Sequence, residues 1–206
     1  PGPRCLAWGL LVAISLLLVG NASHAGSKRD FTVGRLTYKR LTEIHELLGE
    51  QKYQAALKVA SDLQAHTRLN KHEQGLIWQT LGFVYSALEQ LNDAADSFEK
   101  CLDLKALPEQ ALLDTQFNLA QVYLASSKHS KAIGVLENWL TQEKSPPPQA
   151  YYLLAGAYWH TKQIAKALPH LQKAIASVKE PAESWLSLGV SMYFEINSLT
   201  RVRDLL

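Results

Sequence analysis

Apolar residues recur along this chain at the spacing of amphipathic helices, in neighbouring segments separated by short polar turns. Leu41, Ile44 and Leu48 lie on one such helical face, and the stretch from Tyr53 to Leu63 forms a second one. Gly49 lies between the two segments and marks the predicted end of the first helix. The same paired pattern continues to Phe194, and the tail after it departs from the pattern. The sequence therefore predicts an all-α fold built from helix hairpins.

A sequence motif recurs within these predicted hairpins. The clearest copy has the pattern W-x2-L-G-x2-Y followed by A-x3-F and a closing proline, at Trp78, Leu81, Gly82, Tyr85, Ala94, Phe98 and Pro108. This pattern is the signature of the tetratricopeptide repeat. Tyr85, Tyr123 and Tyr158 are 38 and 35 residues apart, and three alanines of the second helices keep the same two spacings. Two sets of residues with one irregular spacing indicate a true internal repeat.

The repeated residues have packing roles in the predicted hairpins. Small residues let two helices approach closely, and rings fill the space between hairpins; the set is Trp78, Gly82, Tyr85, Ala94, Ala120, Tyr123, Ala132, Ala155, Tyr158, Ala167, Trp185 and Gly189. We therefore predict a right-handed superhelical solenoid over residues 35–206, with about four hairpins and an incomplete last repeat. We expect the repeat array to continue beyond Leu206.

The start of the chain has the features of an export signal. Arg4 precedes an uncharged apolar stretch from Leu6 to Gly20, and small residues follow at Ser23 and Ala25. We predict a signal peptide over residues 1–25, cleaved after Ala25, and a disordered lead-in over residues 26–34. A retained membrane anchor is the alternative, but about 15 apolar residues span only about 22 Å as a helix. Stable membrane insertion is therefore not expected once the signal is removed.

The charge balance and the cysteine count limit the classes of function. The chain has 21 basic and 19 acidic residues. This near-neutral balance argues against a nucleic-acid partner, which would require a basic face or stripe. Cys101 is the one cysteine that remains after the predicted cleavage. A secreted chain with one cysteine has no disulfide framework, so its stability must come from packing.

The sequence contains little that suggests catalysis. Neither H-E-x-x-H, nor G-x-S-x-G, nor a P-loop occurs in it. His160 and His170 lie on either side of a predicted turn, and a metal site between them is a weaker interpretation than two surface histidines. Cys101 falls where small residues pack, so we interpret it as a buried filler. We expect no enzymatic activity, no cofactor and no metal site.

A binding surface is the better hypothesis. In an array of this kind the first helices of the hairpins line the concave side, where amides can bond a peptide backbone and rings can give apolar contact. The residues predicted to bind the partner there are Gln79, Phe83, Phe117, Asn118, Gln121, Tyr152 and Trp159. Phe83 and Phe117 could equally pack against neighbouring helices. The predicted partner is a protein or an extended peptide.

Longer segments resemble one exported bacterial family. They include YKRLTEIHELLGEQKYQAAL, QTLGFVYSALEQLNDAADSFEKCLDLKALPEQ and SPPPQAYYLLAGAY, within residues 36–194. They are similar to tetratricopeptide proteins found with the TonB–ExbB–ExbD systems of Gram-negative proteobacteria. The resemblance implies a periplasmic accessory protein of TonB-dependent transport, with TonB-system components among its partners. An envelope or cell-wall assembly scaffold, or the regulatory arm of a larger enzyme with catalysis beyond Leu206, are the alternatives.

Overall fold

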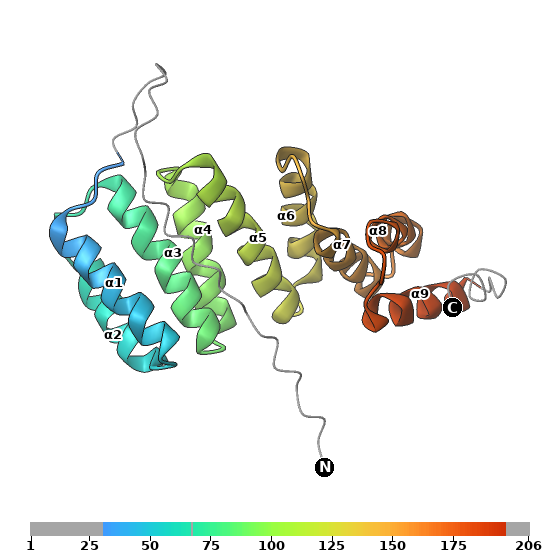
Figure 1. Ribbon diagram of the computed structural model, residues 1–206, viewed down its shortest axis with the longest axis horizontal. Helices are drawn as coiled ribbons and strands as arrows, with labels where there is room; N and C mark the ends of the chain where they lie inside the picture. Colours follow the sequence, from blue (N-terminus) through green and yellow to red (C-terminus); the bar gives the residue numbers. More distant parts are fainter. Residues whose placement is uncertain (1–30, 67, 197–206) are drawn as a thin grey trace, which may run out of the picture.

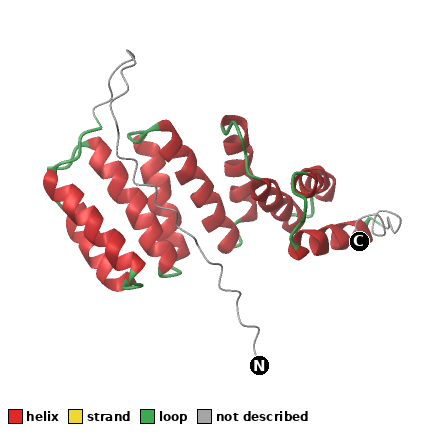
Figure 2. Ribbon diagram, in the orientation of Figure 1, coloured by secondary structure: helices red, strands yellow, loops and turns green. Residues whose placement is uncertain are grey.

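The computed structural model describes residues 31–66 and 68–196, and this part of the chain is entirely helical (Figure 2). The helices are α1 Arg35–Gly49, α2 Tyr53–Gln64, α3 Lys71–Ala87, α4 Leu91–Leu104, α5 Glu109–Ala125, α6 His129–Gln142, α7 Pro148–His160, α8 Ile164–Ala176 and α9 Glu183–Glu195. The all-α repeat prediction is confirmed. The predicted signal peptide, its cleavage after Ala25 and the tail beyond residue 196 lie outside the described residues. None of the described helices has the length and apolar character needed to span a membrane.

Consecutive helices form four antiparallel hairpins, α1–α2, α3–α4, α5–α6 and α7–α8, followed by α9. The hairpins succeed one another along the longest axis of the molecule, from α1 at one end to α9 at the other (Figure 1). In the same view α3 is seen from the side, whereas α8 is seen nearly end on, so the direction of the helix axes changes along the array. Each helix packs against its neighbours in sequence, which is the arrangement of a solenoid.

The four hairpin turns have the same backbone conformation. In each, one residue other than glycine has a left-handed φ, near 60°: Gln51 (59°), Glu89 (58°), Ser127 (58°) and Lys162 (61°). The next residue donates its N–H to a carbonyl five residues earlier, as Gln90 does to Tyr85 at 2.9 Å. This is the bond that closes a helix in the Schellman motif, where glycine usually holds the left-handed position. The first helix ends at Gly49 as predicted, but Gln51, and not the glycine, makes the turn.

Inside the hairpins, small residues lie opposite larger ones. A methyl group placed on Gly82 would lie 2.4 Å from a ring carbon of Phe98 on α4, so only glycine fits there. Ala94, Ala132 and Ala167 on the second helices are fully buried. The predicted packing role of Gly82 is therefore confirmed by its contact, and close approach of α3 to α4 follows from the missing side chain.

The same kind of hydrogen bond, from a tyrosine to a glutamate, occurs at two junctions between successive hairpins. The Tyr123 hydroxyl on α5 donates to the carboxylate of Glu99 on α4, and the Tyr158 hydroxyl on α7 donates to Glu137 on α6. At the next step Gln172 Nε2 on α8 donates to the Tyr193 hydroxyl on α9 at 2.9 Å. We call these three bonds the tyrosine latches. Each ties the first helix of one hairpin to the second helix of the hairpin before it.

The first junction is held differently. Glu73, near the start of α3, is 5% exposed, and its Oε1 accepts hydrogen bonds from Thr37 Oγ1 on α1 (2.6 Å) and from the Gly34 N–H (2.9 Å). Its Oε2 accepts from the Asn70 N–H at 2.9 Å, while the Asn70 side chain accepts from the Glu73 N–H, which forms a capping box. Burial alone would raise the pKa of Glu73, but the bonds from Thr37, Asn70 and Gly34 hold it below its usual value.

The end of the predicted lead-in lies against α3 in this structure. Asn70 Nδ2 donates to the Thr32 carbonyl at 3.0 Å, and the Phe31 ring meets the His72 ring edge to face at 5.0 Å. Residues 31–34 therefore have contacts with the folded repeat, whereas the sequence predicted disorder up to residue 34. The rest of that segment, residues 26–30, lies outside the described part of the chain.

Pro169 is the one proline in the interior of a described helix. It is the sixth residue of α8, beyond the first turn where a missing N–H costs nothing. Its side chain is exposed, so the ring does not interrupt the packed face made by Ala167, Leu171 and Ala174. The helix continues through it to Ala176.

Candidate functional site

The first helices of the hairpins form the inner side of the array. Two pairs of first helices approach one another directly, α1 with α3 and α7 with α9, whereas no two second helices in the described residues approach to the same degree. Helices on the inside of a curved stack are closer together than those on the outside. The side formed by α3, α5 and α7 is therefore the candidate groove, and all seven predicted binding residues lie on these three helices.

Gln79 links two helices and does not present a free amide. Its Nε2 atom donates to Thr115 Oγ1 at 2.8 Å and lies 3.4 Å from the Ala111 carbonyl, both on α5. Thr115 is fully buried. A partner could engage the Gln79 amide only by replacing this bond, so we assign Gln79 to the support of the groove.

Three of the predicted rings are also engaged with neighbouring helices. Phe83 meets Phe98 edge to face with ring centres 5.3 Å apart, and Phe117 lies 4.8 Å from Trp139. Tyr152 on α7 stacks on Trp185 of α9 at 5.4 Å and 19°. All three predicted rings are half-buried. Each can therefore contact a partner only with the part that its neighbour leaves uncovered.

Asn118, Gln121 and Trp159 are the predicted residues with the most freedom to bind. Asn118 and Gln121 are three apart on one face of α5, half-buried, and neither side chain has a hydrogen bond to any described residue. Trp159 on α7 is half-buried, and the ammonium of Lys162 lies 5.4 Å from its ring centre. Two amides with unused donors and acceptors and one accessible indole are the chemistry that suits an extended peptide.

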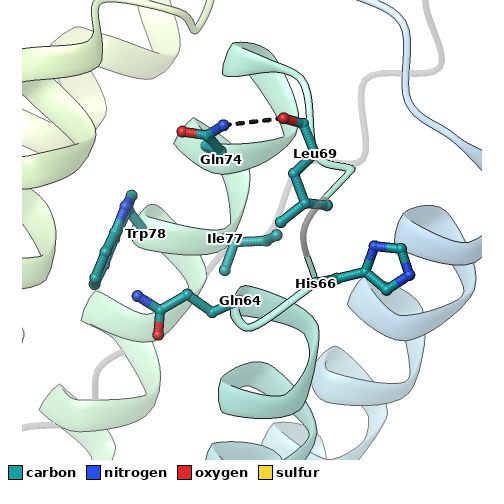
Figure 3. A pocket seen from close by; sticks show the side chains of 6 residues that line it. All are labelled: Gln64, His66, Leu69, Gln74, Ile77 and Trp78. Atoms are coloured by element: carbon teal, nitrogen blue, oxygen red, sulfur yellow. Dashed lines mark hydrogen bonds between the residues drawn. The ribbon is translucent and has the colours of Figure 1, made fainter.

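A small hollow of about 220 Å³ lies elsewhere, where α2 leads into α3 (Figure 3). Gln64, His66, Leu69, Gln74, Ile77 and Trp78 line it, and Gln74 Nε2 donates to the Leu69 carbonyl at 2.9 Å. Lys100 Nζ lies 4.4 Å from the centre of the Trp78 ring. The sequence reasoning did not find this hollow, because nothing but the repeat tryptophan marks it. Its lining offers neutral amides and an imidazole, without a pair of groups suited to acid–base chemistry.

The groups with possible reactivity are placed for packing. Cys101 is fully buried, and burial raises the pKa of its thiol to about 12, so it is not a nucleophile at neutral pH. His160 does not face His170 but stacks on His129, with ring centres 4.3 Å apart. His170 stacks on Tyr151 and Tyr158 instead. Over the residues that the structure describes, no three potential metal ligands come together.

Comparison with known proteins gives the class of repeat. Residues 76–106 and 148–177 match the sequence model of the tetratricopeptide repeat. Over these two segments the chain is similar to the tetratricopeptide repeat. The first matched segment covers α3–α4 and the second covers α7–α8, which are the hairpins with the fullest copies of the motif. A search of curated proteins finds no match to this chain.

Several solved tetratricopeptide structures have the same fold. MamA (residues 41 to the end) from Desulfovibrio magneticus RS-1 is 18% identical, with a TM-score of 0.71 over 84% of this chain and 93% of that chain. A kinesin light chain from Podosopora anserina with nearly identical TPR-like repeats is also 18% identical, with a TM-score of 0.65 over the same shares, 84% and 93%. At this identity the likeness shows the fold alone. The TonB-associated relationship is supported by neither the repeat match nor these structures, and it stays a prediction.

Proposed function

We propose that this protein is an interaction scaffold that binds an extended peptide of a protein partner along the groove formed by α3, α5 and α7. The observation that carries the proposal is the pair of unpartnered, half-buried amides of Asn118 and Gln121 on the inner side of the repeat array. The amide atoms of these two residues are not among the buried polar atoms without a partner, so solvent reaches them. A peptide backbone supplies both donors and acceptors that can take the place of that solvent. Trp159 would add apolar contact.

The test is a peptide selection with a matched control. A library of random dodecapeptides displayed on phage is selected on the purified protein, and the recovered peptides are measured by calorimetry against Asn118→Ala/Gln121→Ala and against Asn138→Ala/Gln142→Ala. The control removes the same two kinds of side chain from the exposed face of the second helix α6. We expect at least a fivefold loss of affinity in the first variant and none in the second. Equal affinity for both variants would overturn the proposed groove.

We further propose that the scaffold works in the periplasm as an accessory of a TonB-dependent transport system. The support is the leader, with its apolar stretch and the small residues Ser23 and Ala25, together with the resemblance of residues 36–194 to the exported TonB-associated family. Expression in a Gram-negative host followed by osmotic shock should release a protein whose mass corresponds to a chain that begins at Gly26, directly after the predicted cleavage site.

The partner prediction needs its own measurement. Affinity purification after crosslinking in intact cells should recover TonB, ExbB or ExbD with the wild-type scaffold and less of them with Asn118→Ala/Gln121→Ala. Release of the scaffold by osmotic shock without any of these three proteins would leave the periplasmic assignment in place and overturn the TonB assignment. Retention of the scaffold in the cytoplasm would overturn both.

A further inference from the structure

The turns of the third and fourth hairpins carry an unusual concentration of positive charge. Lys128 and Lys131 lie at the α5–α6 turn, and Lys162 and Lys166 lie at the α7–α8 turn. No acidic residue occurs in segments 126–136 and 158–179. The α3–α4 turn is the opposite, with Glu89, Asp93 and Asp96 and no lysine or arginine in segment 72–99. The charge at the hairpin turns therefore changes from negative at the α3–α4 turn to positive at the α5–α6 and α7–α8 turns.

The two basic turns form one continuous surface. His129, the first residue of α6, stacks on His160, the last residue of α7, with ring centres 4.3 Å apart and planes 5° from parallel. This contact places Lys128 and Lys131 on one side of the stacked rings and Lys162 on the other. We call the four lysines together with His129 and His160 the lysine edge.

The acidic residues near the lysine edge neutralise it only in part. Lys131 Nζ lies 3.6 Å from Glu99, and Lys162 Nζ lies 3.9 Å from Glu195; both lysine side chains are at least 60% exposed. Pairs this long and this exposed contribute little and exchange readily with another carboxylate. Glu137 accepts the hydrogen bond of Tyr158 and keeps its negative charge, but no ion pair joins it to any of the four lysines.

Lys128 and Lys166 have no acidic partner in the described part of the chain. Lys128 Nζ donates to the neutral side-chain oxygen of Asn92 at 2.7 Å. Lys166 Nζ lies 5.5 Å from the ring centre of Tyr158, and Lys131 lies 5.1 Å from that of Tyr123. The rings hold the ammonium groups at the surface without neutralising them. The lysine edge therefore has one cation without a countercharge on each side of the histidine stack.

We propose that the lysine edge is a second docking surface, which binds an acidic segment of a protein partner. A segment with carboxylates on both sides of the stack would meet Lys128 and Lys131 at one end and Lys162 and Lys166 at the other. A protein is favoured over nucleic acid because the chain as a whole carries a formal charge of only +2, without the strongly basic balance of nucleic-acid-binding domains. This proposal rests on the proposed function in one respect: the partner is a protein. The lysine edge shares no residue with the groove.

The test uses a fluorescein-labelled octapeptide of glutamate as the probe, with a serine octapeptide of the same length as the blank. Anisotropy is measured on the full chain, on Lys128→Gln/Lys166→Gln and on the control Lys39→Gln/Lys58→Gln, which removes two exposed lysines from α1 and α2. We expect binding of the glutamate peptide that weakens with added salt, at least a fivefold loss in the first variant, and no loss in the control. Equal affinity in all three proteins would overturn the proposal.

Two further arms separate the possible occupants. A single-stranded DNA octamer that bound the lysine edge as tightly as the glutamate peptide would overturn the assignment to an acidic protein segment. Sedimentation that showed self-association abolished by Lys128→Gln/Lys166→Gln would assign the edge to the acidic turn of a second copy, and would also overturn it. Asn118→Ala/Gln121→Ala should bind the glutamate peptide normally, so failure of the groove and failure of the lysine edge give different results.

Discussion

At the junction between the first two hairpins, one buried carboxylate joins α1 to α3, whereas at the next two junctions a tyrosine on a first helix donates to a glutamate on the second helix before it. Glu73 receives three hydrogen bonds at the first junction. Tyr123 and Tyr158 each make one latch at the later junctions. The same step of the repeat is therefore stabilised by different chemistry at the two ends of the array.

The reason for the difference lies in one position of the repeat. Glu99, Glu137 and Gln172 are 38 and 35 residues apart, the spacing of the repeat itself, and the equivalent place 38 residues before Glu99 is Ser61. Serine is too short to reach the tyrosine, and the Tyr85 hydroxyl makes no hydrogen bond to any described residue. A repeat array can therefore lose a latch at one step if another polar side chain, here that of Glu73, ties the same hairpins, where the apolar core of α1, α2 and α3 also packs across the junction.

The largest effect is expected from removing that side chain. Glu73→Ala leaves Thr37, Gly34 and Asn70 without their shared acceptor, so the free energy of unfolding should fall by about 3 kcal/mol. Urea denaturation measures it. The control is Glu43→Ala, which removes an exposed carboxylate paired with Arg40 and should cost less than about 1 kcal/mol. Equal losses in the two variants would show that Glu73 does not hold the first junction.

The next largest change in stability is expected in the α3–α4 hairpin, which takes part in both kinds of junction. Gly82→Ala places a methyl group 2.4 Å from Phe98, so α3 and α4 must move apart, at about 2 kcal/mol. Gly134→Ala is the matched change, because a methyl group there meets nothing within 4 Å in the interior of α6. That variant should gain about 0.5–1 kcal/mol from helix propensity. Thermal unfolding of the pair should give shifts of opposite sign.

The latches themselves can be removed one atom at a time. Tyr123→Phe and Tyr158→Phe each leave a glutamate without its donor, and each should lower the free energy of unfolding by about 1 kcal/mol. Tyr85→Phe is the control, because its hydroxyl has no partner in the described residues, and it should stay within about 0.5 kcal/mol of the wild type. If Tyr85→Phe costs as much as the other two, the latches do not explain the later junctions.

The last effect is a dependence on pH. Burial is the main reason that the pKa of Tyr158 is raised to about 12, and the hydrogen bond to Glu137 and the charge of that carboxylate act in the same direction. The unfolded chain then loses this proton first, since a free tyrosine has a pKa of about 10. The stability that depends on Tyr158 should therefore decline as the pH rises from about 10 towards about 12. The loss, followed by urea denaturation over that pH range, should be smaller in Tyr158→Phe than in the wild type.

The fold could be predicted from the sequence because its causes are local and repeated. Gly82 opposite Phe98, and alanines at the crossing of each hairpin, are required wherever two helices approach closely, and they recur at a measurable period. The hairpin turns were harder to place, because they have no glycine at the left-handed position. There the backbone bond to residues such as Tyr85 and Tyr158 closes the helix, whatever the side chain in the turn.

The proposed binding face was predictable only as a side of the array. The helical periodicity of the sequence places Gln79 and Asn118 on first helices, but it does not show which of the two side-chain amides already has a hydrogen-bond partner. Gln79 is bonded to Thr115 because the two helices approach there, a contact between residues 36 apart in the chain. The latches could have been found, since Glu99 and Glu137 share the spacing of the tyrosines. The lysine edge required the stacking of His129 on His160, which no local pattern indicates.

The left-handed residues of the hairpin turns give a practical means of protein engineering. An L-residue in this conformation is disfavoured by about 1 kcal/mol or more, and glycine is not, although glycine loses more chain entropy on folding. Gln51 and Glu89 are exposed. Gln51 lies in the first hairpin, remote from the groove amides and from the lysine edge, whereas Glu89 lies in the hairpin next to the lysine edge. Gln51→Gly and Glu89→Gly should each add about 0.5 kcal/mol. Together they would provide a stabilised background in which damaging variants of either surface remain folded enough to be measured.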